Sequence, residues 1–409
     1  MRKNIRSNLK YFILSGVFNT IMLNLYNPFA VKFLQRIGGD EFHISLQNAL
    51  PGFIGIISSL PGAIYMIRRA DKSMKTHTVQ FMLISRIFIC SFALMVFLPP
   101  AVAPWIFVIL FALKNLPESI SQTAFQGFTG DLFHEDFRST AISLRNKLST
   151  PLAITISLIS GYILRVIPKD DSQRMLIYQI FFLASTLFGI VEVVMFMLIK
   201  EPKNKEKKPK VDIVPVLRNL FKHKPFVRFT KSSLLFYFGW QMGWPLFSIY
   251  QVVNLGADEF WLSIIFVVSA IGSFVGYSFW NDQIRKRGNA IVASITTMGM
   301  ATNPILLAIS PNLYWAAALN FTIGFFTAGN VTVLLNGLLE ATPDENRVLY
   351  VGAYNTLINI SLTLSPLVAH SVLRLTGIFW ALIIVGLVRI SGSIVFYRSH
   401  IKGISEESG

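Results

Sequence analysis

The sequence predicts an all-α membrane protein with twelve transmembrane helices in two six-helix pseudo-repeats and both termini in the cytoplasm. Of its 409 residues, 53% are hydrophobic and only 14% are charged, whereas soluble globular chains carry roughly 25% charged residues. Apolar runs of about 20 residues, long enough to cross a bilayer as a helix, recur along the chain. The net charge of +16 gathers between alternate apolar runs, as positive-inside topology requires.

Loop signals divide the chain into predicted helices and two bundles. The basic segment 200–224 is the main linker. It separates an N-terminal bundle at 1–199 from a C-terminal bundle at 225–409, and residues 214–226 within and after it suit an amphipathic helix on the membrane surface. The apolar run that follows the basic N-terminus has no small-residue cleavage site, so we expect it to be retained. The helices are predicted at 11–36, 44–67, 76–98, 104–130, 137–165, 174–199, 228–254, 259–282, 288–310, 313–340, 346–374 and 377–398.

Composition also argues against several classes of function. A topology bias accounts for the excess positive charge, so nucleic-acid binding is not expected. The single Cys90 excludes an intrachain disulfide and a cysteine cluster for zinc. The sequence contains no GxxxxGK[ST] phosphate-binding loop. We therefore expect no cofactor, no metal and no enzymatic activity.

Two phrases occur once in each half of the chain. GGDEFHISL at 38–46 matches GADEFWLSI at 256–264, and DLFHEDFRSTAISLRN at 131–146 parallels EATPDENRVLYVGAYN at 340–355. The two matches follow the same order and are predicted on opposite sides of the membrane. Parallel six-helix halves are typical of one transporter architecture.

These features resemble the major facilitator superfamily of secondary transporters, of bacterial type. The resemblance rests on the acid and Arg of the second phrase, on GYSFWNDQIRKRGN at 276–289 and on PLFSIYQVVNLGADEF at 245–260. It implies alternating access around a cavity lined by the first, fourth, seventh and tenth helices. The chain departs from the family pattern where Arg285 stands at the place expected for an acid, and the fifth helix lacks the Gly-Pro pair of drug/proton antiporters.

Glu118 is the predicted proton-coupling residue, because an ionisable group at membrane depth is costly and is a functional candidate. It lies roughly 20 Å from either membrane face at 1.5 Å per residue. Lys114, Ser121 and Gln122 share its helix face, and we expect Lys114 to pair with Glu118 in one transport state and to meet substrate in another. The alternative is a permanent structural ion pair. Pro117 is a further candidate, for a local break in this helix.

Neutral residues on three other helices are candidates for binding a neutral or amphipathic organic solute by stacking and hydrogen bonding. The alternative is that these amides and hydroxyls bridge helices while the rings pack. Outside the cavity, we expect Arg86, Glu192 and Arg389 to have scaffold roles, with Arg86 and Glu192 as a pair, and the GxxxG spacings at Gly239 and Gly272 to mark close helix contacts. The substrate-binding candidates are Lys114 and Gln122 with Thr20, Asn24, Asn27, Tyr237, Trp240, Gln241, Trp244, Asn320, Thr327 and Asn330.

The repeated phrase at 131–146 and 340–355 predicts a cytoplasmic gate. Glu340 would end a helix, where the dipole disfavours an acid and calls for a cation. Arg347 and Arg285 are its candidate partners, and Asp131 with Arg138 is the corresponding pair of the first half. The alternative is that these turns only tether neighbouring helices.

The predicted function is secondary active transport of a small organic solute across the cytoplasmic membrane. We expect a monomer embedded in membrane lipids, coupled to a proton rather than to sodium. One alternative is a multidrug or amphipathic-metabolite exporter of the same fold. Another is a non-transporting sensor or a lipid scramblase.

Overall fold

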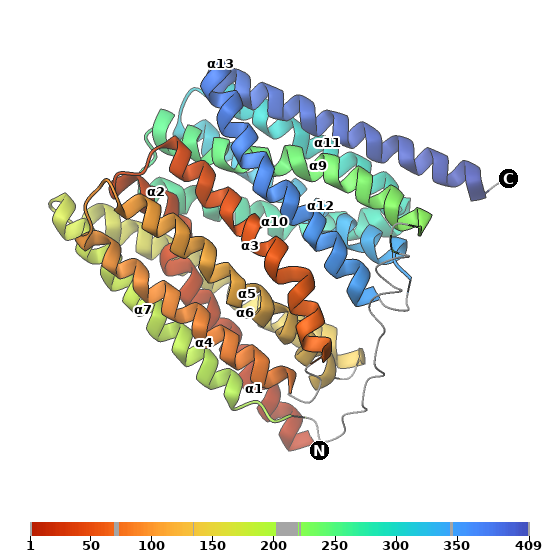
Figure 1. The fold of residues 1–409 in the computed structure, drawn as a ribbon, viewed down its shortest axis with the longest axis horizontal. Coiled ribbons are helices and arrows are strands. Elements are labelled where there is room, and N and C mark those ends of the chain that lie inside the picture. The colour runs from red at the N-terminus through yellow and green to blue at the C-terminus, as the bar shows by residue number, and fades with distance from the viewer. Residues whose placement is uncertain are drawn as a thin grey trace. The chain divides into compact units, whose positions relative to one another are not determined.

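A computed structural model describes residues 2–68, 73–133, 135–201, 220, 222–343 and 347–407, and throughout that part of the chain every regular element is a helix (Figure 1). Contacts divide the chain into two compact units. The first comprises Met1–Asp40 and Ile57–Val211, and the second comprises Glu41–Ile56 and Asp212–Gly409. The predicted surface helix at 214–226 lies mostly outside the described residues.

The first unit is a bundle whose core is dominated by phenylalanine. α1 packs against α6 and α7, and α4 packs against α5 and α7. Phe12, Phe128 and Phe196 are buried where these helices meet. Its elements are α1 (Arg2–Tyr26), η1 (Asn27–Phe29), α2 (Ala30–Arg36), the part of α3 (Glu41–Arg68) after Ile56, α4 (Met74–Phe92), η2 (Ala93–Phe97), α5 (Ala103–Leu132), α6 (Glu135–Val166) and α7 (Asp171–Met197).

The second unit is also a helix bundle. α9 packs against α13, α10 against α12, and α11 against both α12 and α13. The first half of α3 also belongs to this unit: a Cβ on Gly52 would lie only 2.7 Å from the main-chain nitrogen of Thr363 in α13. Its remaining elements are α9 (Lys224–Ile249), the π-helical turn η3 (Tyr250–Asn254), α10 (Glu259–Arg287), α11 (Asn289–Ala308), α12 (Leu313–Ala341) and α13 (Arg347–Glu407).

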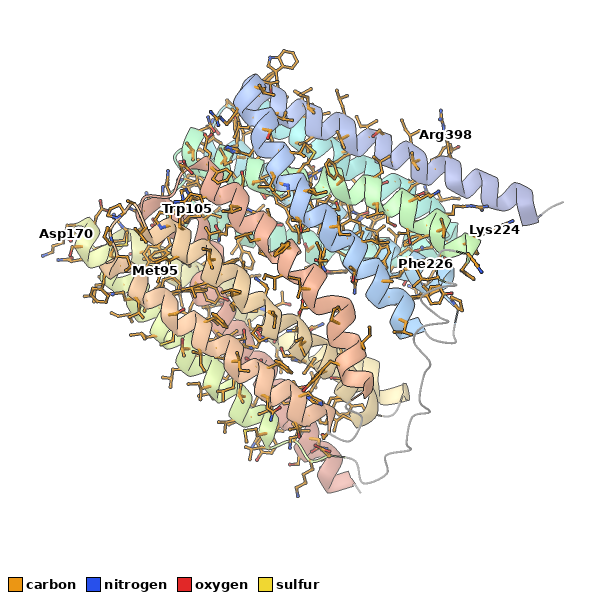
Figure 2. The ribbon with its side chains drawn as sticks, in the orientation of Figure 1. Met95, Trp105, Asp170, Lys224, Phe226 and Arg398 are labelled. Carbon is orange, nitrogen blue, oxygen red and sulfur yellow. The ribbon has the colours of Figure 1, made fainter. Side chains whose placement is uncertain are left out.

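Local sequence explains where several helices begin and bend. The side chain of Asp170 accepts a hydrogen bond from the main-chain nitrogen of Gln173 at the start of α7 (Figure 2), which satisfies a free helix N–H. α1 ends at Tyr26, and Pro28 is the second residue of η1. Proline lacks the N–H that would continue the α-helix. Within α13, Gly377 takes φ 77°, so α13 consists of two helices joined at this residue.

The repeated phrase at 38–46 and 256–264 adopts equivalent structures. Gly38 and Gly256 both have positive φ, at 100° and 68°, a region that favours glycine. Glu41 and Glu259, which are 218 residues apart (259 − 41), each begin a helix. The all-helical fold and its internal repeat are therefore as the sequence predicts.

Eight helical segments in the described residues are long and apolar enough to cross a membrane. They include α4 to α7 and α10 to α12, and the last, Leu349–Arg398, spans the Gly377 junction of α13. α1, α3 and α9 fall outside this set. The number of crossings, the side of the termini and the domain boundaries at 199 and 225 remain predictions.

Candidate functional site

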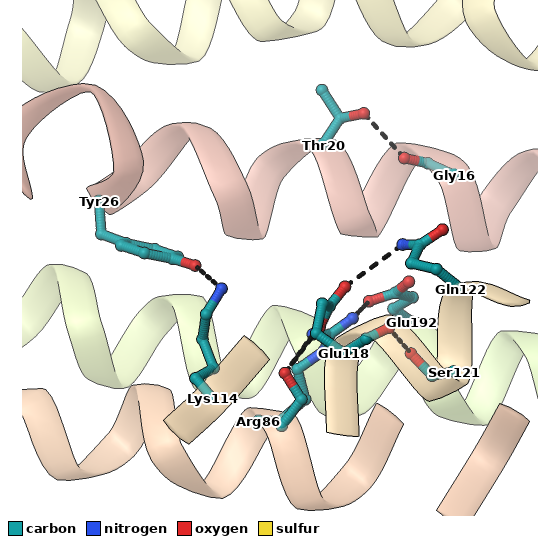
Figure 3. Close-up of polar contacts among 10 residues, drawn as sticks. Gly16, Thr20, Tyr26, Arg86, Lys114, Glu118, Ser121, Gln122 and Glu192 are labelled. Atoms are coloured by element: carbon teal, nitrogen blue, oxygen red, sulfur yellow. Dashed lines mark hydrogen bonds and ion pairs between the residues drawn. The ribbon is translucent and has the colours of Figure 1, made fainter. Parts of the chain in front are cut away.

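A buried chain of three charged side chains crosses the first unit. Arg86 of α4 donates from Nη1 to Oε2 of Glu118 in α5 and from Nη2 to Oε2 of Glu192 in α7, both at 2.8 Å (Figure 3). Arg86 is 1% exposed and Glu192 is fully buried, whereas the Glu118 side chain is 19% exposed. The predicted Arg86–Glu192 pair is confirmed, but Glu118 completes the same network, so Arg86 is not remote from the candidate proton site.

The two carboxylate oxygens of Glu118 have different surroundings. Oε2 accepts from Ser85 Oγ at 2.6 Å in addition to Arg86. Among the described residues, Oε1 receives only a longer contact, 3.3 Å from Nε2 of Gln122, one turn further along α5. One oxygen is therefore held by two close donors, while the other has a single weak donor. Ser121, also expected on this polar face, donates instead to the main-chain oxygen of Glu118.

Lys114 does not form the expected ion pair with Glu118 in this structure. Its Nζ contacts the hydroxyl of Tyr26 in α1 at 3.3 Å and lies 5.6 Å from the ring centroid of Phe111 (Figure 3). Lys114 is buried, and among the described residues no carboxylate lies within ion-pair distance of it. The reason is geometric: Arg86 reaches Glu118 from α4, and Lys114 extends toward α1. Pro117 lies between them without ending α5, which is continuous from Ala103 to Leu132.

Arg145 of α6 is a further cation that the sequence prediction missed. Its guanidinium lies over the rings of Phe125 and Phe12, 4.7 and 5.1 Å from their centroids, and it interacts electrostatically with Glu192. A Cβ on Gly16 would overlap the Arg145 side chain, so a glycine on α1 makes room for it. Among the described residues, the local charge comprises three cations (Arg86, Lys114 and Arg145) and two carboxylates (Glu118 and Glu192).

Close helix packing places Arg86 between its partners. A Cβ on Gly189 of α7 would lie 2.7 Å from Cδ of Arg86 and 2.8 Å from the sulfur of Met22. Only glycine lets α7 approach closely enough for Glu192, three residues later, to reach the guanidinium. Gly189 and Glu192, three residues apart on α7, are therefore the sequence signal for this network.

An aromatic series on α9 is the main feature of the predicted substrate residues in the second unit. The ring centroids of Tyr237 and Trp240 are 5.4 Å apart, and those of Trp240 and Trp244 are 6.2 Å apart. Trp244 is exposed and Trp240 is partly exposed. Gln241 behaves differently, because its buried Oε1 accepts from Ser361 of α13 at 2.7 Å, so Gln241 bridges two helices.

The remaining predicted substrate residues are mostly engaged locally. Asn24, Thr20 and Asn320 each donate to a main-chain oxygen four residues earlier on their own helix. Thr327 contacts the sulfur of Met300 at 3.5 Å, and Asn27 is exposed in η1. Asn330 is fully buried on α12, and neither of its amide atoms has a hydrogen-bond partner in the described part of the chain. An unpaired buried amide is unusual and costly.

Arg389 of α13 is a buried cation in the second unit. Three main-chain oxygens accept its hydrogen bonds: Gly239 and Trp240 of α9 at 3.0 Å each, and Met300 of α11 at 2.9 Å. A Cβ on Gly243 would overlap its Nη2. The glycines at 239 and 243 therefore mark a close helix contact, as predicted, and Gly243 also leaves space for the guanidinium of Arg389. Gly272 and Gly276 likewise bring α10 against the main chain of α12.

The predicted gate is described only in part. Arg285 forms an ion pair with Asp282 one turn earlier on α10 and does not reach Glu340 in this structure. Glu340 is exposed near the end of α12. Asp131, Arg138 and Arg347 lie on helices, but their side chains are outside the described set. The gate therefore remains a prediction.

The known proteins that the chain matches agree with this architecture. Among solved structures, a crystal structure of a mutant form of the nucleoside transporter NupG superposes with a TM-score of 0.73 and 11% sequence identity, covering 95% of this chain and 99% of that one. No curated protein sequence matches significantly. A family model described as Major Facilitator Superfamily matches residues 12–276 and 232–405. The chain therefore belongs to the major facilitator superfamily and is a multi-pass membrane protein with the fold of a secondary transporter.

Proposed function

We propose that the protein is a proton-coupled secondary active transporter of a small neutral organic solute, with Glu118 as the proton-binding group. The observation that carries this proposal is the unequal environment of its carboxylate. Oε2 is fixed by Arg86 and Ser85, while Oε1, on a partly exposed side chain, is held among the described residues only by Gln122 at 3.3 Å. A proton adds at Oε1, and the amide of Gln122 can turn to accept from it.

Glu192 makes this protonation tolerable for the rest of the network. Burying a charge without a partner costs several kcal/mol. When Glu118 becomes neutral, Arg86 keeps its 2.8 Å contact with fully buried Glu192. Glu118 can therefore change its charge while Arg86 and Glu192 remain paired.

The solute class follows from the aromatic series on α9. Tyr237, Trp240 and Trp244 offer ring faces without a formal charge, which suits a planar, neutral molecule. A nucleoside has a flat base and several hydroxyl groups, and the NupG structure to which the fold is similar is that of a nucleoside transporter. Nucleosides are therefore the first solutes to test.

Transport and coupling can be tested separately in proteoliposomes. Counterflow of radiolabelled uridine, then of other neutral solutes, measures exchange without a proton gradient, while accumulation under an imposed pH gradient measures coupling. We expect Glu118→Gln to retain counterflow and to lose accumulation, and Glu118→Asp to keep both. Equal accumulation by Glu118→Gln and the unmodified protein would exclude Glu118 as the coupling site. Failure of every neutral solute in counterflow would exclude the proposed solute class.

A further inference from the structure

A surface groove runs between α11 and the last part of α13 in the second unit. It has a volume of about 430 Å³, within the roughly 300–1,000 Å³ typical of small-molecule sites. Ile291, Ile295 and Met298 line it from α11, and Ile394 and Tyr397 line it from α13. All five side chains are exposed, so the groove is open along one side.

The two serines that line this groove, Ser294 and Ser393, are already hydrogen-bonded within the protein. Ser393 donates to the main-chain oxygen of Ser294 at 3.1 Å and accepts from Thr297 at 2.9 Å. Ser294 donates to the main-chain oxygen of Ala290 at 3.2 Å. An occupant therefore need not supply hydrogen bonds to these serines, and a hydrocarbon chain can lie along the apolar walls without leaving either serine unsatisfied.

Three cations are placed at one end of the groove. α11 and α13 run in opposite directions, and Ser393 of α13 lies level with Ser294 of α11. Four residues further along α13, about 6 Å from Ser393, Tyr397 is therefore level with Ala290 of α11. Arg398 on α13 and Lys286 with Arg287, just before α11, therefore lie at the same end. All three are exposed, and none is paired with a carboxylate in the described residues. Figure 2 shows Arg398 projecting outward from α13.

We infer that this groove binds an anionic phospholipid. One acyl chain lies against Ile295, Met298 and Ile394, and the phosphate of the headgroup is bound by Arg398 with Lys286 and Arg287. Clusters of Lys and Arg next to transmembrane helices are suited to acidic headgroups, because cations near the membrane surface attract lipid phosphates. The site is independent of the proposed transport mechanism, since no residue of the Glu118 network contributes to it.

Native mass spectrometry of the full-length protein with one added lipid can test this site. Dioleoyl-phosphatidylglycerol and dioleoyl-phosphatidylcholine share their acyl chains and differ in headgroup charge. We expect the phosphatidylglycerol to bind more tightly, and Arg398→Ala to weaken it about 5-fold while leaving the phosphatidylcholine unchanged. Ile295→Trp fills the groove and should weaken both lipids.

Lys224→Ala is the matched control, because it removes one exposed cation at the start of α9, a helix that does not line the groove. It should leave binding of both lipids unchanged, and thermal unfolding should show that all variants are folded. Equal binding of the two lipids by the unmodified protein would overturn the inference. So would an equal loss of phosphatidylglycerol binding in Lys224→Ala and Arg398→Ala, because the attraction would then be general surface charge.

Discussion

The Arg86 network predicts an unusual order of stability among charge-removing variants. Removing one partner of a buried ion pair costs about 3–5 kcal/mol, because the other charge is left without compensation. Arg86→Met leaves the Glu192 carboxylate without its ion-pair partner. Glu192 is fully buried, and its Oε1 has no hydrogen bond in the described residues. We therefore expect a loss within this range. Glu192→Gln leaves Arg86 paired with Glu118 at 2.8 Å and should cost only about 1.5–3 kcal/mol, the value of a hydrogen bond to a charged group.

The double variant separates this reasoning from simple loss of packing. Arg86→Met with Glu192→Gln removes both buried charges and leaves Glu118 beside Ser85 and Gln122. It should be at least about 1 kcal/mol more stable than Arg86→Met alone, since contacting residues are not additive. The free energy of unfolding in mixed micelles, followed by circular dichroism as a denaturing detergent is added, measures each value. A double variant that loses the sum of the two single losses would refute the network.

Three further predictions concern close contacts in the structure. Gly243→Ala should destabilise the protein by about 1–3 kcal/mol by overpacking against Arg389. The same substitution should destabilise an Arg389→Met protein less, and thermal unfolding of the variants measures both effects. Trp240→Ala should raise KM for a transported solute about 2- to 10-fold, from a stacking contribution of about 0.5–1.5 kcal/mol, while Trp240→Phe should stay near the original value in counterflow assays. Gly52→Ala should lower the unfolding temperature more than Gly62→Ala. The new Cβ at position 52 would lie 2.7 Å from main chain, whereas the one at position 62 would lie 3.2 Å from a flexible side chain. Equal shifts in unfolding temperature would contradict the α3–α13 packing.

The helices could be predicted from the sequence because apolar length and loop residues are local properties. The equivalence of Gly38 and Gly256 was also predictable, since both copies of the phrase carry the glycine and the acid that begin a helix. Which helices pack against one another could not be predicted from the sequence. Glu118 has Lys114 one turn away on its own helix, and that spacing alone favours an i, i+4 pair, whereas its partner Arg86 comes from α4.

The contacts of Arg389 show a second limit of sequence reasoning. Its acceptors are main-chain oxygens, and every residue has one, so residue type gives no signal. The only local sign is glycine at 239 and 243, which predicts close packing but not what fills the space. The cation Arg145 was missed for a related reason, because its partners include aromatic faces that also occur throughout the core.

Arg86 and Arg389, both buried, differ in whether their partners have been made when they enter the membrane. An arginine at the centre of an inserting helix costs about 2.5–3.5 kcal/mol at the translocon. Arg86 belongs to α4, which leaves the ribosome before the helices that carry Glu118 and Glu192. Arg389 belongs to α13, which follows both α9 and α11, the helices that supply its oxygens. A nascent chain stopped after α4 therefore holds Arg86 in the membrane without either carboxylate partner, and its retention there depends on the apolar residues around Arg86. By contrast, the last helix enters a bundle in which the acceptors for its arginine have already been made.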